Sequence, residues 1–370
     1  RLFDPYCGTG TSLVEGLLFG LDVIGTDINP LARLIATAKT DTLSPKTARQ
    51  AINEFYKQSL NRNLLRVEPI TGLPGIKNLS FWFKPDVIHA LTALLRYIDS
   101  MEDGPLRRFF QVAFSETVRE ASNTRNDEFK LYRYSPDALA AFQPDVFQIM
   151  TKKLERNYQG LACFNTRIRA LGLRPSATVC RFNTVDEMPF HISPESIDVV
   201  VTSPPYGDSH TTVAYGQYSR LSAAWLGLPE PETIDRKLMG GTKRKTLPVF
   251  ACEPLNRAIQ RITGEDAARA REVAAFYDDL HKSINNVSTI IRYGGYACYV
   301  VGNRIVKNVA LPTDTVIRSF FESNGFSHIE TYTRSIPNKR MPKKNSPTNI
   351  AGKMASTMTK EYIVVMRKNG

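Results

Sequence analysis

Two short stretches of the sequence combine residue types that can hold a small charged ligand and act on a polar group. The first is FDPYCGTGTSL, residues 3–13, in which glycines and threonines follow an aspartate. The second is TSPPYGDS, residues 202–209, which follows the apolar run 197–201. Glycines let the backbone approach a ligand closely, and two prolines make the exit from a strand rigid. We therefore expect a ligand-binding turn and a rigid loop that presents a hydroxyl, carbonyl oxygens and an aromatic ring.

Both stretches come directly after predicted strands. Residues 1–40 read as strand, glycine turn, helix, strand, turn and helix, and the strand pattern resumes at 177–182 and 197–206. Strands and helices that alternate with short connections predict a doubly wound, mostly parallel sheet. A nucleotide-like ligand would lie across the carboxyl ends of these strands.

Two aspartates strengthen this interpretation. Asp4 ends the first predicted strand, where a carboxylate can meet a cationic group, and Asp27 ends the second, 17 residues after Gly10. An acid at the second position can bind the two hydroxyls of a ribose. The alternative is that both aspartates only cap the helices that follow them. A dinucleotide site is less favoured, because Leu13 stands where its third glycine is expected.

Composition points to a nucleic-acid partner. The 370 residues carry 48 Lys and Arg against 36 acids, for a net charge of +12. Such a balance favours a polyanionic ligand. The five cysteines have no metal-ligand spacing, which indicates a reducing compartment, and no apolar run reaches the roughly 18 residues of a membrane span. The chain begins at Arg1 without Met, so we expect its native N-terminus to lie elsewhere.

The middle of the chain departs from the strand–helix rhythm. Residues 41–176 read as a polar, largely helical insertion, and 229–265 as a second, basic loop insertion. A long helix is expected over about 266–293, a strand over 294–304, and an amphipathic helix over 313–326. The segments 327–335 and 360–368 are expected to form a terminal antiparallel pair that closes the sheet.

The two motifs together carry a family resemblance. FDPYCGTGT resembles motif I of S-adenosylmethionine-dependent methyltransferases, and TSPPY resembles motif IV of their amino-methyltransferase branch. In that order they are similar to DNA amino-methyltransferases, most closely the cytosine-N4 group, whose motif IV typically reads S-P-P-Y. The resemblance covers roughly 1–40, 177–228 and 290–368. It implies a Rossmann-like α/β methyltransferase sheet with an antiparallel terminal strand, in a catalytic domain of 1–40, 177–228 and 266–370.

The resemblance also implies roles for single residues. Ser203 and the Pro204 carbonyl would hold the target amine, Pro205 would help to fix that carbonyl, and Tyr206 would stack on a flipped base. The remaining positions would bind the cofactor S-adenosylmethionine: Asp4, Cys7, Gly8, Thr9, Gly10, Thr11, Asp27, Ile28 and Asn183. Asn183 is expected to end the strand 177–182, where the family usually has an acid near the cofactor adenine. Asp186 is the alternative for that contact.

Several alternatives remain open at this point. The protein could be an adenine-N6 DNA methyltransferase, an RNA guanine-N2 methyltransferase, or a non-catalytic specificity subunit with a vestigial cofactor site. Cytosine-C5 methylation is disfavoured because it needs a cysteine nucleophile, usually after proline, and no cysteine lies near TSPPY. His210 is more simply interpreted as a polar loop residue than as a base.

Double-stranded DNA is the expected macromolecular partner. The insertion 41–176 is the candidate target-recognition region, with REASNTRNDEFKLYRY at 119–134 its most suggestive segment. The basic segments 240–246 and 338–344 could grip phosphates. The family association predicts a restriction–modification system in the cytoplasm of a prokaryote, associated with the nucleoid. A cognate restriction endonuclease is an expected partner of such a system. The family's motif X has no room in the sequence, so we expect a missing N-terminal segment or a partner chain to supply it.

Overall fold

Seven strands form one central sheet in the computed structural model. The structure describes residues 1–60, 63–125, 131–207, 215–229, 234–242, 246–335, 344–345, 355–356 and 360–370. The sheet has the strand order β3-β2-β1-β4-β5-β11-β8. Its strands are β1 (Leu2–Asp4), β2 (Val23–Thr26), β3 (Ala177–Cys180), β4 (Ile197–Thr202), β5 (Ile291–Val301), β8 (Phe326–Ser335) and β11 (Lys360–Lys368).

The strand directions agree with the sequence prediction. The neighbours from β3 to β5 pair in parallel, whereas β11 lies antiparallel between β5 and β8. The expected terminal antiparallel pair is therefore confirmed, as is the Rossmann-like fold class. Short pairs flank the sheet: β6 (Ile305–Val306) with β7 (Val309–Ala310), and β9 (Lys344–Asn345) with β10 (Ala355–Ser356).

Helices cover both faces of the sheet. They include α1 (Thr11–Leu18), α2 (Pro30–Thr40), α11 (Glu253–Glu265), α12 (Ala267–Ile290) and α13 (Thr313–Glu322). Strand side chains alternate between faces, so Leu2 joins the hydrophobic cluster of α1 while Phe3 joins the larger cluster under α11, α12 and α13. Among the described residues, none of the helices is long and apolar enough to cross a membrane.

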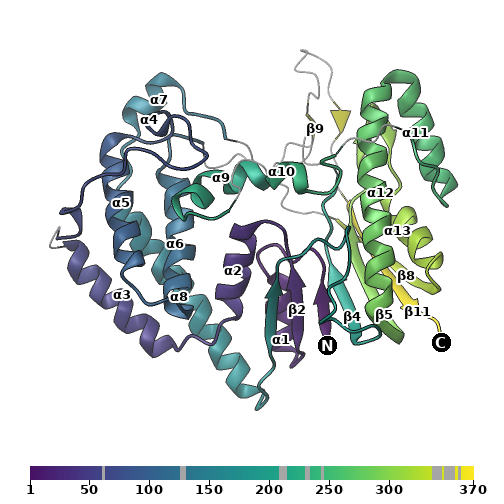
Figure 1. The fold of residues 1–370 in the computed structure, drawn as a ribbon, viewed down its shortest axis with the longest axis horizontal. Helices are drawn as coiled ribbons and strands as arrows, with labels where there is room; N and C mark the ends of the chain where they lie inside the picture. The colour runs from purple at the N-terminus through teal and green to yellow at the C-terminus, as the bar shows by residue number, and fades with distance from the viewer. Residues whose placement is uncertain are drawn as a thin grey trace.

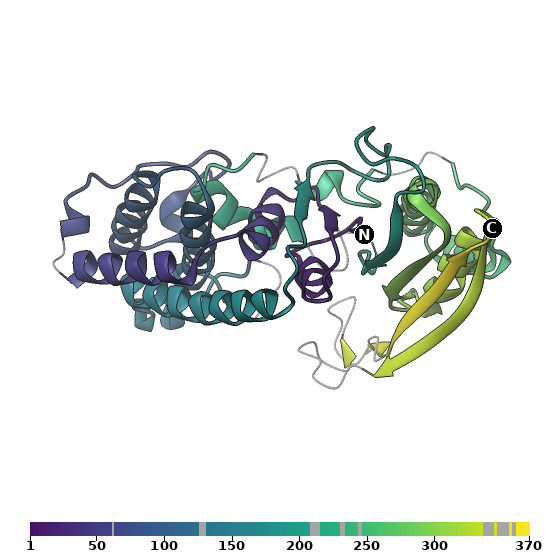
Figure 2. The same cartoon turned by 90° about the horizontal axis from the view of Figure 1, so that it is seen from below.

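A helical half lies beside the sheet and has its own hydrophobic core (Figures 1 and 2). It contains α3 (Pro45–Leu60), the 3-10 turn Asn63–Leu65, α4 (Leu79–Trp82), α5 (Pro85–Asp99), α6 (Pro105–Ala121), α7 (Pro136–Ala141) and α8 (Val146–Ala170). The predicted helical insertion therefore corresponds to helices α3 to α8. A later helix, α9 (Tyr215–Trp225), also enters this core, through the fully buried Trp225.

Two expected boundaries are corrected. Residues 229–265 were expected to be a basic loop, but they include α10 (Ile234–Lys237) and the longer α11. The apolar positions Leu255, Ala258, Ile259 and Ile262 follow a helical period and are buried against the sheet half, which explains α11. The long helix ends at Ile290 rather than near 293, since Ile291 already begins β5.

Candidate active site

The two motifs lie at the same edge of the sheet. The turn after β1, the turn after β2, the segment after β3 and the loop after β4 belong to four adjacent parallel strands, so their carboxyl ends meet. Helices α9 and α10 run across this edge and connect it to the helical half (Figure 1). The structure thus brings all the predicted site residues to one side of the molecule.

Asp27 ties the glycine turn to the end of β2. Its Oδ2 accepts the backbone N–H of Gly8 at 3.0 Å, and its Oδ1 accepts the N–H of Asn29 at 2.8 Å. Asp27 is not the N-cap of α2; that role belongs to Asn29, whose side chain accepts from Leu31 N. Burial raises the pKa of Asp27, although these two hydrogen bonds oppose the shift. The carboxylate is therefore held in a fixed direction beside the turn.

The glycines of the turn have different surroundings. Gly8 has a φ of +49°, and a Cβ built there would meet nothing within 4 Å. Gly10 has a φ of +78° and precedes α1, and a Cβ there would lie 2.9 Å from the Cβ of Ala36 on α2. Gly10 thus serves the packing of the turn on α2, whereas Gly8 leaves open space in front of its backbone. Thr9 lies between them, and Thr11 is the first residue of α1.

Asp4 connects the two motifs directly. Its carboxylate accepts hydrogen bonds from the Thr202 hydroxyl at 2.5 Å, from Tyr6 N at 3.0 Å and from the Ser12 hydroxyl. Thr202 is the last residue of β4, immediately before Ser203. Burial raises the pKa of Asp4 to about 6, against the opposing effect of these hydrogen bonds. Like Asp27, Asp4 does not cap the following helix, because Gly10 is the N-cap of α1.

A cavity of about 160 Å³ lies at the ends of β2 and β3. It is lined by the two predicted residues Ile28 and Asn183, together with Arg181, Phe182, Ile234 and Lys237. Its volume is several times the roughly 30 Å³ that one water occupies in the liquid, so it can admit part of a ligand. Ile234 and Lys237 were not predicted from the sequence as site residues, because the segment that forms α10 was expected to be part of a loop.

The position of Asn183 differs from the expectation. β3 ends at Cys180, so Asn183 lies three residues beyond the strand rather than at its end. Its side-chain carbonyl accepts the backbone N–H of Val185 at 3.1 Å, which forms a local turn. The alternative Asp186 is exposed and does not line the cavity.

The loop after β4 presents Ser203 to solvent and buries Pro204. The Ser203 hydroxyl donates to the Tyr206 hydroxyl at 3.4 Å, and Tyr206 in turn donates to Glu361 Oε1 at 2.9 Å. Glu361, on β11, also accepts from Arg334 of β8 at 2.5 Å. Glu361 was not predicted from the sequence as a site residue, because its proximity to the loop depends on β11 lying between β5 and β8.

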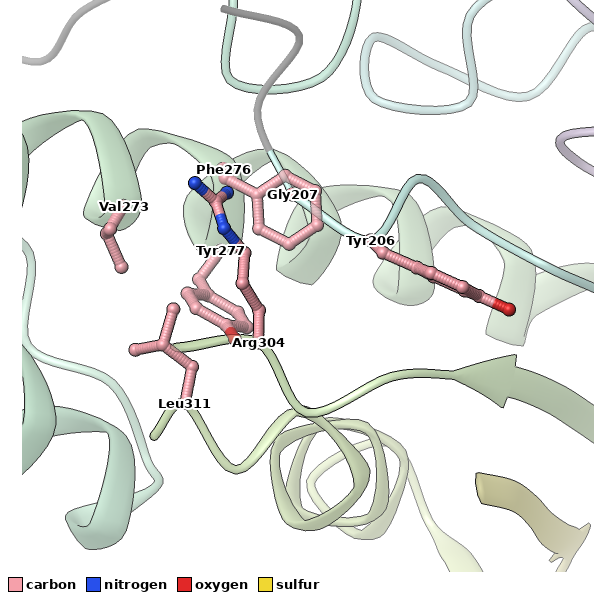
Figure 3. Close-up of a pocket in the computed structure, with 7 residues that line it drawn as sticks. All are labelled: Tyr206, Gly207, Val273, Phe276, Tyr277, Arg304 and Leu311. Atoms are coloured by element: carbon pink, nitrogen blue, oxygen red, sulfur yellow. The ribbon is translucent and has the colours of Figure 1, made fainter. Parts of the chain in front are cut away.

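The loop after β4 continues to Gly207, where the side chain of Arg304 lies so close to the backbone that only glycine fits. Its φ is +150°, and a Cβ there would overlap the guanidinium of Arg304. Arg304, Tyr277 and Leu311 line a cavity of about 10 Å³ next to Gly207, and the ring of Tyr206 points away from it (Figure 3). Pro205 precedes Tyr206 and is half-buried. The rigid loop is thus held between the β5 side of the sheet and Glu361.

Cys7 is the site cysteine, and its surroundings oppose nucleophilic chemistry. Burial and the nearby Asp27 and Asp4 raise the pKa of its thiol. A thiol that stays protonated is a weak nucleophile. His210 lies outside the described residues, as do most of 338–344, residues 243–245 of the basic segment 240–246, and residues 126–130 of the segment 119–134.

Comparison with known proteins identifies the family. No family model matches the chain. The type II methyltransferase M.MvaI of Kocuria varians is 41% identical over 381 residues, which covers 99% of this chain and 84% of that protein. The chain belongs to the type II methyltransferases, which are S-adenosylmethionine-dependent DNA methyltransferases of restriction–modification systems.

Solved structures show a weaker likeness. Two structures of TTHA0409 from Thermus thermophilus, assigned as a DNA modification methylase, have TM-scores of 0.23 and 0.24 at 20% and 18% identity. The second is a complex with S-adenosyl-L-methionine. Each match covers 48% of this chain and about half of the other chain, 47% and 50% respectively. The family assignment rests on the Kocuria protein.

Proposed function

We propose that this DNA methyltransferase transfers a methyl group to the exocyclic N4 amine of cytosine, by direct transfer to a base flipped out of the duplex. The observation that carries the proposal is the hydrogen bond between Thr202 and Asp4. It links the loop with Ser203 to the glycine turn on the adjacent strand. The residue before Ser203 is thereby held on the strand that leads into the turn suited to a cationic cofactor.

The described residues fit S-adenosylmethionine. Gly8 leaves open space before its backbone, and the turn it belongs to contacts two buried carboxylates, those of Asp4 and Asp27. In our proposal Asp4 holds the amino group of the cofactor, Asp27 its ribose hydroxyls, and Ile28 and Asn183 its adenine. Cys7, Thr9, Gly10 and Thr11 shape the turn around the methionine part. When bound, the cofactor supplies an electrophilic methyl group on a sulfonium.

Ser203 and Pro204 act on the target amine. The lone pair of an exocyclic amine is delocalised into the base, so the nitrogen is a poor nucleophile. Acceptance of its two N–H groups by the Ser203 hydroxyl and the Pro204 carbonyl favours a pyramidal nitrogen with an available lone pair. As the new N–CH₃ bond forms, the S–CH₃ bond of the sulfonium would break to leave a neutral thioether, and the nitrogen would give up a proton. Ser203 is exposed and can pass that proton to solvent.

Tyr206 supplies a flat partner for the flipped base. Flipping costs a few kcal/mol, and stacking on an aromatic ring returns about 1–3 kcal/mol. Glu361 limits the directions available to the Tyr206 ring. Positioning carries most of the catalysis, since the methyl group is already activated. Covalent catalysis by a cysteine is disfavoured by the raised pKa of Cys7.

The identity of the methylated nucleoside tests the proposal. The protein is incubated with tritiated S-adenosylmethionine and unmethylated bacterial DNA, and the DNA is digested to nucleosides and separated by chromatography. We expect the label in N4-methylcytosine, at a rate lower by about 10²–10³ with a Ser203→Ala variant. Label in N6-methyladenine would overturn the cytosine assignment, and label only in a parallel RNA sample would overturn the DNA substrate.

A further inference from the structure

Three exposed aromatic rings of the helical half each lie under an arginine. The guanidinium of Arg133 is 4.5 Å from the ring centroid of Phe81, that of Arg125 is 5.2 Å from Tyr132, and that of Arg119 is 5.3 Å from Tyr218. The residues Phe81, Tyr132 and Tyr218 are 39%, 45% and 47% exposed. We call these six residues the arginine–aromatic surface.

A short antiparallel pairing of residues 123–125 with 132–134 holds this surface together. Arg125 N donates to Tyr132 O at 2.8 Å and Tyr134 N donates to Asn123 O at 3.0 Å. Between these bonds, Thr124 and Arg133 form an antiparallel β-bridge. This pairing is anchored on α4, since Asn123 donates through its backbone to Trp82 O at 2.7 Å and through its side chain to Phe81 O at 3.1 Å. The three pairs therefore belong to one contiguous structure.

Buried polar contacts make the support of the arginine–aromatic surface rigid. Arg119 is only 6% exposed, and its guanidinium donates to Thr124 Oγ1 at 2.5 Å and to Arg125 O at 3.2 Å. Ser122 and Thr124 are fully buried. A buried network of this kind fixes side-chain directions. The exposed residues Arg125, Tyr132 and Arg133 are therefore attached to a rigid, buried polar network.

The surface is connected to the cofactor side of the active site. Tyr218 lies on α9, the first helix after the Ser203 loop. Its neighbour Ser219 accepts a hydrogen bond from the Asn29 side chain at 3.2 Å, and Asn29 N donates to Asp27. Helix α9 spans the two halves at the edge where the strands end (Figure 1). Through α9 the surface is therefore joined by direct contacts to the residues beside Asp27.

We infer that the arginine–aromatic surface reads the bases next to the flipped cytosine. An arginine fork donates in its own plane, which suits bidentate contact with the major-groove edge of guanine. An aromatic ring under the guanidinium holds that plane while leaving a face for a base to stack. The inference rests on the proposed role of the helical half as the target-recognition region. In this inference the arginine–aromatic surface contacts the edges of the bases, and other parts of the protein contact the DNA phosphates.

Selection from a random pool of duplex DNA tests the inference without any methyl transfer. The full chain is mixed with the pool and S-adenosylhomocysteine, and the bound duplexes are sequenced. We expect wild type to enrich one sequence. Arg133→Ala and Arg125→Ala should each lose at least about fivefold of the preference at one or two positions. Arg318→Ala, which removes an exposed arginine on α13, should leave the enriched sequence unchanged.

Arg133→Lys separates base reading from charge. It keeps the positive charge but loses the planar fork, so we expect the same loss of sequence preference with an unchanged salt dependence of binding. Calorimetric binding of S-adenosylhomocysteine confirms that each variant is folded. The inference is overturned if the variants bind more weakly but enrich the wild-type sequence. It is also overturned if wild type enriches no sequence, or binds a random RNA pool in preference to DNA.

This outcome is independent of the proposed chemistry. A wild-type protein that methylated adenine would contradict the cytosine assignment, yet the selection could still support the reading surface. Conversely, N4-methylcytosine in the product together with unchanged selection by the variants would overturn the reading surface alone.

Discussion

The Tyr206 hydroxyl donates a hydrogen bond to Glu361 Oε1 at 2.9 Å, across 155 residues of sequence. Glu361, on β11, also forms an ion pair with Arg334 on β8. Two strands at one end of the sheet therefore hold the Tyr206 side chain of the loop after β4. The antiparallel insertion of β11 therefore has a local consequence at the candidate active site. It fixes the far end of the ring that we propose stacks on the target base.

Removal of this hydroxyl should slow methyl transfer without removing the ring. We expect Tyr206→Phe to lower kcat/KM for DNA about tenfold, because a hydrogen bond to a charged acceptor contributes about 1.5 kcal/mol. Tyr206→Ala should lower it further, since stacking is also lost. Steady-state kinetics on unmethylated DNA provides the measurement, with calorimetric cofactor affinity as the control. Equal activity of Tyr206→Phe and wild type would show that the ring needs no such fixing.

The two glycines of the first turn should respond differently to alanine. Gly8→Ala costs about 1 kcal/mol for a left-handed residue but meets no protein atom, so cofactor affinity should fall with a small loss of stability. Gly10→Ala also pushes against Ala36 and should cost clearly more stability. Denaturant unfolding and calorimetry measure both quantities. A Gly8→Ala protein with wild-type cofactor affinity would argue against a ligand in that space.

Cofactor affinity should depend on pH through Asp4. With a pKa of about 6 in the free protein, Asp4 is about one-tenth ionised at pH 5 and mostly ionised at pH 8. If its carboxylate holds the cofactor's amino group, affinity should be about tenfold weaker at pH 5 than at pH 8. Calorimetry of wild type and Asp4→Asn across this range is the test. The variant should bind weakly at both values; an identical pH profile would assign the effect to another group, such as Asp27.

Asp4 should also make the stability of the free protein depend on pH, in the direction opposite to cofactor affinity: stability should fall as the pH rises. The folded pKa of Asp4 is raised from 3.8 to about 6, so its contribution is fully present below pH 3.8 and is lost as the pH rises through about 6. The free energy of unfolding of wild type relative to Asp4→Asn should fall by about 1 kcal/mol between pH 5 and pH 8. Urea unfolding at the two values measures this difference. A difference that rises with pH would contradict the raised pKa.

Local sequence signals predicted the strands and turns that form the site. Asp4 lies at the end of β1, and Gly8 and Asp27 lie in the turns after β1 and β2, as expected, because short apolar strands precede these turns and parallel strands bring their ends together. The observed β4 agrees with the expected strand from residue 197, and Ser203 follows directly after it. These features depend on residues close together in the sequence.

The features that were missed depend on long-range packing. Glu361 and Arg304 reach the Ser203 loop only once the sheet has assembled, and nothing in their own sequence neighbourhood indicates it. Asp4 and Asp27 could be interpreted as helix caps from sequence, whereas the structure gives their oxygens to the turn itself. The basic composition of 229–265 concealed the helical period that buries α11.

The central claim is that Ser203 acts on the target amine while the glycine turn holds the cofactor. The most direct measurement is the rate of N4-methylcytosine formation by Ser203→Ala at saturating cofactor, with cofactor affinity measured on the same preparation. We predict a rate lower by about 10²–10³, the usual effect of removing one group that stabilises a transition state, and an affinity within about twofold of wild type. A wild-type rate, or a loss of cofactor binding with the rate, would contradict the account.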